Sequence, residues 1–86
     1  MANYRVFIKP SAVKELEALP RRDRQRAADR IRRLSGAPRP RGVEKLSGLE
    51  RYRVRQGDYR IVYAIDDREK AVTVFKVGHR REVHRE

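Results

Sequence analysis

The chain has 86 residues, with 23 Lys and Arg against 12 Asp and Glu, and its formal net charge is +11. This length predicts a single domain, and a sequence without cysteine excludes disulfides, thiol catalysis and thiolate metal sites. No apolar run approaches the roughly 20 residues of a membrane-spanning helix, and the opening residues do not resemble a signal peptide. We therefore expect a cytoplasmic domain whose partner is anionic: a nucleic acid, an acidic lipid surface or an acidic protein.

The first elements predicted along the chain are a strand and a helix. Residues 3–9 alternate between apolar and polar side chains, which is typical of a β-strand. Pro10 ends the strand, and Ser11 can cap a helix that runs through Leu19. Pro20 then breaks that helix and can begin the next one. The apolar sides of the strand and helix are formed by Tyr4, Val6, Ile8, Val13, Leu16 and Leu19.

A second helix is predicted over residues 21–35. Ala27, Ile31 and Leu34 follow one another at helical spacing and form an apolar stripe. Gly36 fits the position just after the end of this helix. The two helices should make a hairpin with one apolar side, and that side is too narrow for strong insertion into a membrane. The opposite side of the second helix carries Arg22, Arg26 and Arg33.

The rest of the chain is predicted to be β-structure. Strands are expected over 51–55, 58–66 and 70–77, with turns at 56–57 and 67–69. The order of elements is then β-α-α-β-β-β. This order favours an α+β fold, in which a three- or four-stranded, mostly antiparallel sheet carries the helical hairpin on one face.

The predicted turn at 56–57 brings arginines together. A two-residue loop there places Arg55 opposite Asp58 and Arg53 opposite Arg60, with all three arginines on the face away from the helices. Like charges directly across an antiparallel pair repel, and guanidinium groups match phosphate oxygens while keeping their charge. The pattern therefore predicts a bound anion. The alternative interpretation is an ordinary solvated face on which Asp58 neutralises Arg55.

The C-terminal residues 79–86 add a titratable side chain. If the strand predicted over 70–77 runs beside the strand that holds Arg60, the following residues return toward Arg60 and Arg53. His84 is then the nearby side chain whose ordinary pKa lies close to neutrality.

Three short runs, in this order, carry a resemblance to a known family. They are 45–49 (KLSGL), 52–55 (YRVR) together with 57–63 (GDYRIVY), and 77–83 (VGHRREV). With the opening strand and the proline-broken helix pair, these runs resemble the RelE branch of the RelE/ParE toxin superfamily over nearly the whole chain.

The resemblance implies a RelE-like fold and the toxin of a type II toxin–antitoxin system. Such a toxin inhibits translation as an endoribonuclease, an mRNA interferase that cuts mRNA in the ribosomal A site without a metal ion or cofactor. The implied partners are the ribosome, its mRNA and an acidic antitoxin similar to RelB. Operator DNA would be contacted only through the toxin–antitoxin complex.

The resemblance also implies roles for individual residues. Arg60 and Arg80 match the active-site arginines of the family, Arg53 and Arg55 stand where lysines are common, and His84 stands where many members have a catalytic tyrosine. The residues expected to act in catalysis are Arg53, Arg55, Arg60, Arg80 and His84. The residues expected to bind RNA phosphates are Arg53, Arg55, Arg60, Arg80 and Arg81.

Two departures from the family pattern leave alternatives open. Arginines at 53 and 55 cannot share in proton transfer as a lysine of lowered pKa can, whereas an imidazole at 84 can accept or donate a proton near pH 7. His84 is the leading acid–base candidate for this reason, and the general base remains unassigned. One alternative is a ParE-like toxin that inhibits gyrase and is not a nuclease. The other is a toxin fold with weakened catalysis that keeps only its binding function.

Overall fold

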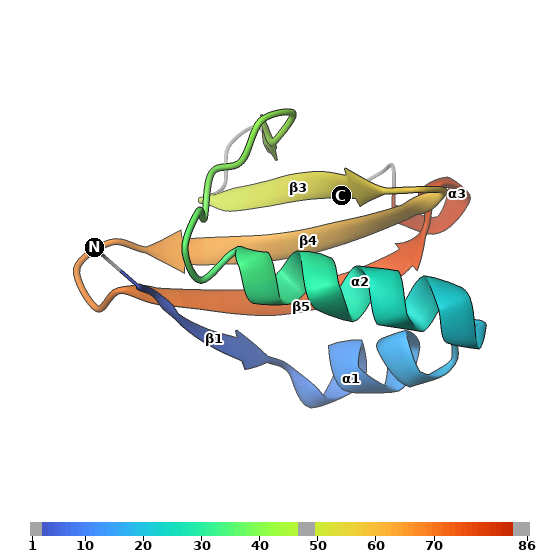
Figure 1. Cartoon of the computed structure of the whole chain (residues 1–86). Coiled ribbons are helices and arrows are strands. Elements are labelled where there is room, and N and C mark those ends of the chain that lie inside the picture. The colour runs from blue at the N-terminus through green and yellow to red at the C-terminus, as the bar shows by residue number, and fades with distance from the viewer. Residues whose placement is uncertain (1–2, 47–49, 84–86) are drawn as a thin grey trace.

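A computed structural model describes residues 3–46 and 50–83, and these residues form one sheet with a helical hairpin on one face (Figure 1). The sheet has the order β1-β5-β4-β3-β2, in which β1 runs parallel to β5 and the other pairs are antiparallel. This arrangement confirms the predicted α+β class. None of the described helices is long and apolar enough to cross a membrane. In chain order the elements are β1 (Arg5–Ile8), α1 (Pro10–Glu17), α2 (Arg21–Arg33), β2 (Glu44–Lys45), β3 (Arg51–Gln56), β4 (Tyr59–Asp66), β5 (Ala71–His79) and α3 (Arg80–Val83).

The sheet has five strands rather than the predicted three or four. The additional strand is β2, which consists of two residues and pairs Glu44 with Arg53 and Lys45 with Tyr52. Two residues are too few to show the alternation by which a strand is recognised in a sequence. Although it is short, β2 places a carboxylate beside the strand that carries Arg53.

The core lies between the helical hairpin and one face of the sheet. The predicted stripe of α2 is confirmed, since Ala27, Ile31 and Leu34 are all buried. Full burial of a Leu, Ile or Val side chain stabilises a fold by about 1.5–3 kcal/mol, so this interface holds the two layers together. The sheet contributes the buried side chains of Tyr52, Val54, Ile61, Tyr63, Val72, Val74 and Val77.

The turn between β3 and β4 lies one residue later than predicted. Gln56 pairs with Tyr59, which leaves Gly57 and Asp58 as the two loop residues. Gly57 has a φ of 61°, in the left-handed region that favours glycine. A glycine at the first loop position is the mark of a type II′ hairpin turn. Our assignment of the loop to Gln56 and Gly57 was therefore wrong.

The register changes with the turn, but the faces do not. Arg55 pairs with Arg60 and Arg53 pairs with Val62, so the predicted pairs of Arg55 with Asp58 and of Arg53 with Arg60 are both wrong. The correction moves one strand by two residues along the other. Since side chains alternate with a period of two, each side chain stays on its predicted face.

A bulge in β5 accounts for the irregular pattern of that strand. Val62 pairs with Lys76, but the next residue of β4, Tyr63, pairs with Val74, so Phe75 is an extra residue. A bulge of this kind changes the side on which the following residues lie. The valines on both sides of it therefore reach the same core: Val72, Val74 and Val77.

Helix α1 covers the part of β5 that β1 leaves open. The strand β1 pairs only with residues 71–74 of β5. Beyond them, the Glu15 carboxylate accepts a hydrogen bond from the Val77 backbone N–H at 2.9 Å, and its other oxygen lies 3.6 Å from the Lys76 ammonium. An unpaired buried backbone donor costs about 1–3 kcal/mol, so Glu15 stabilises this edge of the sheet.

A carboxylate outside the core ties three loops together. Asp67, in the turn between β4 and β5, accepts two hydrogen bonds from the guanidinium of Arg39, at 2.9 and 3.2 Å, and one from the Tyr4 hydroxyl at 2.7 Å. These hydrogen bonds, those of Arg39 first, lower the pKa of Asp67 to about 2. The segment after α2, the β4–β5 turn and the residue before β1 are thereby joined.

The substitution Asp67→Asn should lower the melting temperature at pH 7 and have little effect near pH 2. The pKa of Asp67 in the fold lies below its ordinary value of 3.8. The stabilisation is therefore complete above about pH 4 and is lost as the pH falls through about 2. Melting curves of both proteins between pH 2 and 7 test this, with the exposed Glu17→Gln as control. A difference that persists unchanged at pH 2 contradicts the expectation.

Candidate functional site

Two arginines face each other on the side of the sheet away from the helices. Arg55 on β3 and Arg60 on β4 are direct cross-strand partners next to the hairpin turn. Residues in such a pair have Cβ atoms about 4.5–5.5 Å apart, and like charges placed this way repel. The corrected register therefore brings these two guanidinium groups closer together than the sequence predicted.

Arg53 is held in place by the carboxylate of Glu44. Its Nε and Nη2 lie 3.2 and 3.1 Å from the same carboxylate oxygen, and its side chain is only 18% exposed. The pairing of β2 with β3 puts these two residues directly opposite each other. Glu44 thus fixes the orientation of Arg53 beside the Arg55–Arg60 pair.

Arg80 lies at the same end of the sheet, as the first residue of α3 directly after β5. Strand β5 pairs Gly78 with Arg60, and the backbone N–H of Arg80 donates a hydrogen bond of 2.8 Å to the carbonyl of Asp58 in the β3–β4 turn. The start of α3 is therefore tied to the hairpin that holds Arg55 and Arg60. We call Arg53, Arg55, Arg60 and Arg80 the arginine cluster.

The electrostatics of Arg60 place it at the centre of this cluster. Burial first, and then the positive charges of Arg55, Arg53 and Arg80, lower the pKa of Arg60, while Glu44 acts in the opposite direction. Its Nη1 is buried and has no acceptor among the described residues. A buried donor without an acceptor is costly, and an anion bound here would remove that cost and the repulsion together.

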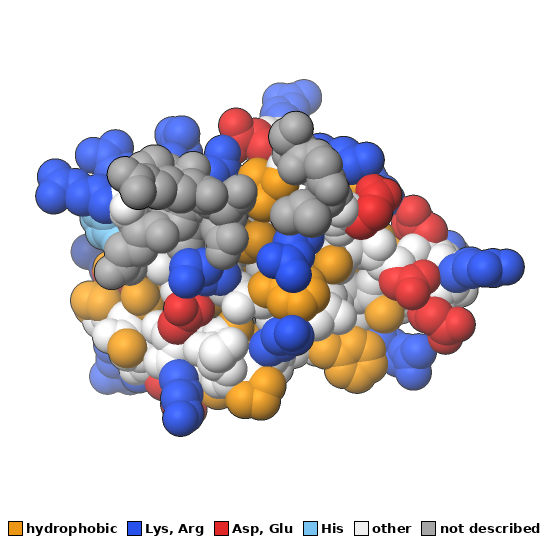
Figure 2. All heavy atoms as spheres, turned by 180° about the vertical axis from the view of Figure 1, so that it is seen from behind, with side chains coloured by type: hydrophobic (Ala, Val, Ile, Leu, Met, Phe, Trp, Pro, Cys, Tyr) orange, Lys and Arg blue, Asp and Glu red, His pale blue; other side chains and the backbone are white. Residues whose placement is uncertain are grey.

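The remaining predicted site residues lie at the C-terminal end. Arg81 is exposed on α3, and its backbone N–H donates to Nδ1 of His79 at 3.3 Å. His84 lies outside the described residues. Lys and Arg side chains gather at the end of the molecule that holds α3, on the face opposite the helical hairpin (Figure 2).

Sequence reasoning missed Glu44 as a member of this site. The strand that carries it has only two residues, so no periodic pattern indicates which face Glu44 occupies. A carboxylate three residues after the proline–arginine segment 38–41 is unremarkable in a chain with 41% charged residues. Only the pairing of β2 with β3 shows that this carboxylate faces an arginine of the cluster.

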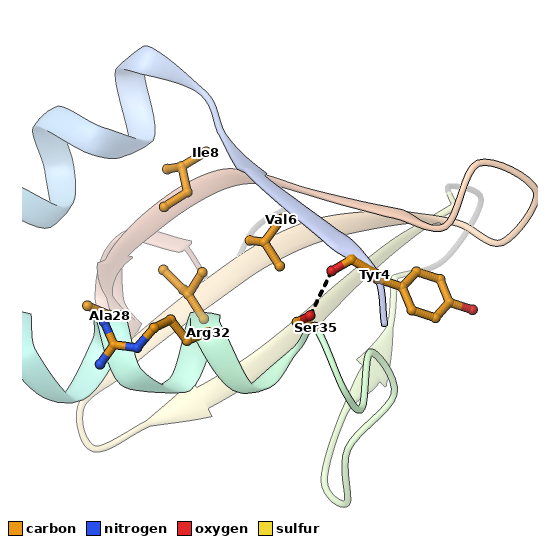
Figure 3. A pocket seen from close by; sticks show the side chains of 7 residues that line it. Tyr4, Val6, Ile8, Ala28, Arg32 and Ser35 are labelled. Carbon is orange, nitrogen blue, oxygen red and sulfur yellow. Dashed lines mark hydrogen bonds between the residues drawn. The ribbon is translucent and has the colours of Figure 1, made fainter. Parts of the chain in front are cut away.

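A second surface feature lies on the other side of the sheet. A groove of about 480 Å³ runs between β1 and α2, and it is mostly apolar (Figure 3). One end is closed by Ser35, whose hydroxyl donates to the Tyr4 carbonyl at 2.7 Å. We call it the β1–α2 groove. Its lining residues are Tyr4, Val6, Ile8, Ala28, Ile31, Arg32 and Ser35.

Comparison with known proteins defines the class of the molecule. The family of the ParE toxin of the type II toxin–antitoxin system parDE matches residues 6–84. The protein is therefore a toxin of the type II toxin–antitoxin class. The chain belongs to the ParE toxin family within the RelE/ParE superfamily, and the resemblance to that superfamily is confirmed.

Solved structures of RelE toxins share this fold. The toxin–antitoxin complex RelBE2 from Mycobacterium tuberculosis contains a chain that is 30% identical, with a TM-score of 0.81 over 91% of this chain and 99% of that one. The RelE–RelB complex from Pyrococcus horikoshii OT3 gives 35% identity and 0.81 over 93% and 97%. A variant of E. coli RelE in the free state gives 25% identity and 0.79 over 95% and 88%. A search of the curated proteins found no match.

The substitution Arg55→Gln should stabilise the fold. It removes one charge of the Arg55–Arg60 pair, and the free energy of unfolding should rise by about 0.2–1 kcal/mol. The gain should shrink between low and high NaCl concentration, because salt screens exposed charges. Urea unfolding at both salt concentrations measures the effect. Arg22→Gln, an exposed change on α2, is the control, and an equal response of the two variants contradicts the expectation.

Proposed function

We propose that the protein is an endoribonuclease toxin that inhibits translation by cleaving mRNA in the ribosomal A site. The observation that carries this proposal is the arginine cluster, in which Arg55 and Arg60 pair across adjacent strands and a buried donor of Arg60 has no acceptor among the described residues. Such a cluster suits the phosphate of a nucleic acid. The similarity to RelE toxins agrees with this choice of substrate.

The proposed reaction is attack of a ribose 2′-hydroxyl on the adjacent phosphate. A P–O bond forms to the 2′-oxygen while the bond to the 5′-oxygen breaks, giving a 2′,3′-cyclic phosphate and a free 5′-hydroxyl. Negative charge builds on the phosphoryl oxygens in the transition state. Fixed cations directed at that charge stabilise it, and the loss of one comparable donor slows an enzyme by about 10²–10³-fold.

Each member of the cluster has a place in this reaction. Arg60 and Arg80 hold the phosphate and stabilise its developing charge. Arg53, oriented by Glu44, and Arg55 position the RNA backbone and lower the pKa of the 2′-hydroxyl. None of these guanidinium groups releases a proton near neutral pH.

The C-terminal residues carry out proton transfer and contact a phosphate next to the scissile one. His84 moves the proton, since an imidazole titrates near neutral pH, and general acid–base catalysis contributes about 10²–10⁴-fold. Arg81 contacts a neighbouring phosphate. The ribosome orients the message for in-line attack, so free RNA is a poor substrate.

The proposal is tested by single-turnover cleavage of a defined message in a purified translation system. Arg60→Ala and Arg80→Ala should each slow cleavage by about 10²–10³-fold, because each removes a donor from the charged phosphoryl group. Arg22→Ala, exposed on α2, should leave the rate within threefold. Equal rates for all four proteins would exclude the arginine cluster as the catalytic centre.

The same assay tests the role of His84. The substitution His84→Ala should slow cleavage by at least tenfold and flatten the pH dependence of the rate near neutrality, since it removes the group that moves the proton. A rate within threefold of the unchanged protein would assign proton transfer to another group.

The family match favours one second candidate, a ParE-like toxin that inhibits DNA gyrase. A gyrase supercoiling assay beside the ribosome assay separates the two functions. Inhibition of supercoiling without cleavage of mRNA would replace the proposal by this candidate.

We propose that the partner of this toxin is an acidic antitoxin with an amphipathic segment. A net charge of +11 favours an acidic partner, and the β1–α2 groove offers that segment an apolar seat with Arg32 at its rim. The related chains from M. tuberculosis and P. horikoshii come from toxin–antitoxin complexes. The antitoxin should also cover the arginine cluster.

The adjacent reading frame should encode a small acidic protein that binds this chain. Ala28→Glu places a carboxylate in the groove and should weaken binding of that protein at least tenfold, as measured by calorimetry, because the charge meets both apolar and acidic surface. Gln25→Glu adds the same charge at an exposed position of α2 outside the groove lining. If both variants bind the antitoxin equally, the β1–α2 groove is excluded as its binding site.

A further inference from the structure

A depression lies beside the arginine cluster, at the edge of β3 next to the residues that lead into β2. Its volume is about 370 Å³, roughly ten times the ~30 Å³ share of one water molecule, so a hydrated phosphate group fits. We call it the β3-edge depression. It shares Arg55 with the cluster, contains Glu44, which pairs with Arg53, and adds two further arginines. Its lining residues are Arg30, Arg41, Gly42, Glu44 and Arg55.

The chain builds this depression from three separate segments. The turn at residues 40–43 is closed by a hydrogen bond from the Val43 N–H to the Pro40 carbonyl at 3.1 Å, with Gly42 at a φ of 85°. Because β2 and β3 are antiparallel and Glu44 pairs with Arg53, the residues before Glu44 run alongside the end of β3. Arg41 is thereby brought beside Arg55, and Arg30 reaches the same depression from α2.

The charges around the depression are unbalanced. Glu44 is the carboxylate of its lining, and one of its oxygens already accepts both contacts from Arg53. Within the described parts of the chain, Arg30, Arg41 and Arg55 have no ion pair. By contrast, Arg32 and Arg33 both form ion pairs with Asp29, and Arg39 forms an ion pair with Asp67.

Arg30 carries a further sign of a missing acceptor. Its Nε is buried and has no hydrogen-bond partner among the described residues. Arg60 in the arginine cluster has a buried donor in the same condition. Buried polar atoms are almost always paired in folded proteins, so both guanidinium groups are arranged as if for an anion.

We propose that the β3-edge depression binds a second phosphate of the same RNA strand. Arg30 and Arg41 hold that phosphate, and Arg55 lies between it and the phosphate at Arg60 and Arg80. The inference rests on the proposed function and adds the direction of the RNA: from the scissile linkage across the end of β3 toward α2. The toxin then holds this phosphate and the scissile phosphate through separate sets of arginines.

The test compares oligonucleotides that differ in the number of their phosphates. Fluorescently labelled 2′-O-methyl RNA cannot be cleaved, and it is made as a dinucleotide with one phosphodiester and as a tetranucleotide with three. The double variant Arg30→Gln/Arg41→Gln is compared with Arg22→Gln/Arg26→Gln, which removes the same charge from exposed positions of α2. Binding is followed by fluorescence anisotropy at 20–200 mM NaCl.

The unchanged protein should bind the tetranucleotide at least tenfold more tightly than the dinucleotide. Arg30→Gln/Arg41→Gln should lose most of that gain and keep its affinity for the dinucleotide within twofold. The slope of log affinity against log salt for the tetranucleotide should fall by about 0.7, the value for one phosphate of a single strand. The control, Arg22→Gln/Arg26→Gln, should still bind the tetranucleotide at least tenfold more tightly than the dinucleotide.

Two results would overturn the inference. Equal losses in the two double variants would mean that only the overall charge matters. If Arg30→Gln/Arg41→Gln weakens binding to the ribosome but not to the tetranucleotide, the depression binds ribosomal RNA instead of the message. Neither result depends on cleavage, so the cleavage assay with Arg60→Ala judges the proposed function separately. Melting curves of each variant verify that it is folded.

Discussion

The direct pairing of Arg55 with Arg60 across the β3–β4 hairpin is the constraint on which the rest of the molecule depends. Two guanidinium groups at this separation repel each other, and only a hairpin held by other forces keeps them together. Those forces act on the opposite face, where the Tyr52 and Tyr63 rings stack with centroids 6.0 Å apart. Val54 lies in the same buried layer against the helices. The apolar face thus stabilises a polar face that is unfavourable by itself until an anion is bound.

Much of the fold follows from patterns that are visible in the sequence. The stripe of Ala27, Ile31 and Leu34 and the alternation of the strands define two layers, and both are present. The faces of the hairpin arginines were predicted correctly although the turn was not. A shift of two residues exchanges partners without exchanging sides, so the face of a strand is a more robust prediction than its register.

The rest depends on contacts between segments that are distant in the sequence. The bulge at Phe75 arises where β5 must keep valines on both sides of it in one core, and no local pattern indicates which residue will be extra. The carboxylate of Glu44 is in the site only because β2 pairs with β3. Likewise, Arg30 and Arg41 are brought together by the course of the chain after α2. Local periodicity in the sequence carries no information about such long-range contacts.

The parallel pairing of β1 with β5 has a consequence for synthesis of the chain. The β1 strand leaves the ribosome early, but its hydrogen-bonding partner is β5, more than sixty residues later. Pairings between distant segments form slowly because a long loop must close first. Arg80 follows directly after β5, so the sheet and the arginine cluster become complete at almost the same moment. The arginine cluster therefore stays incomplete until β5 and Arg80 have been synthesised.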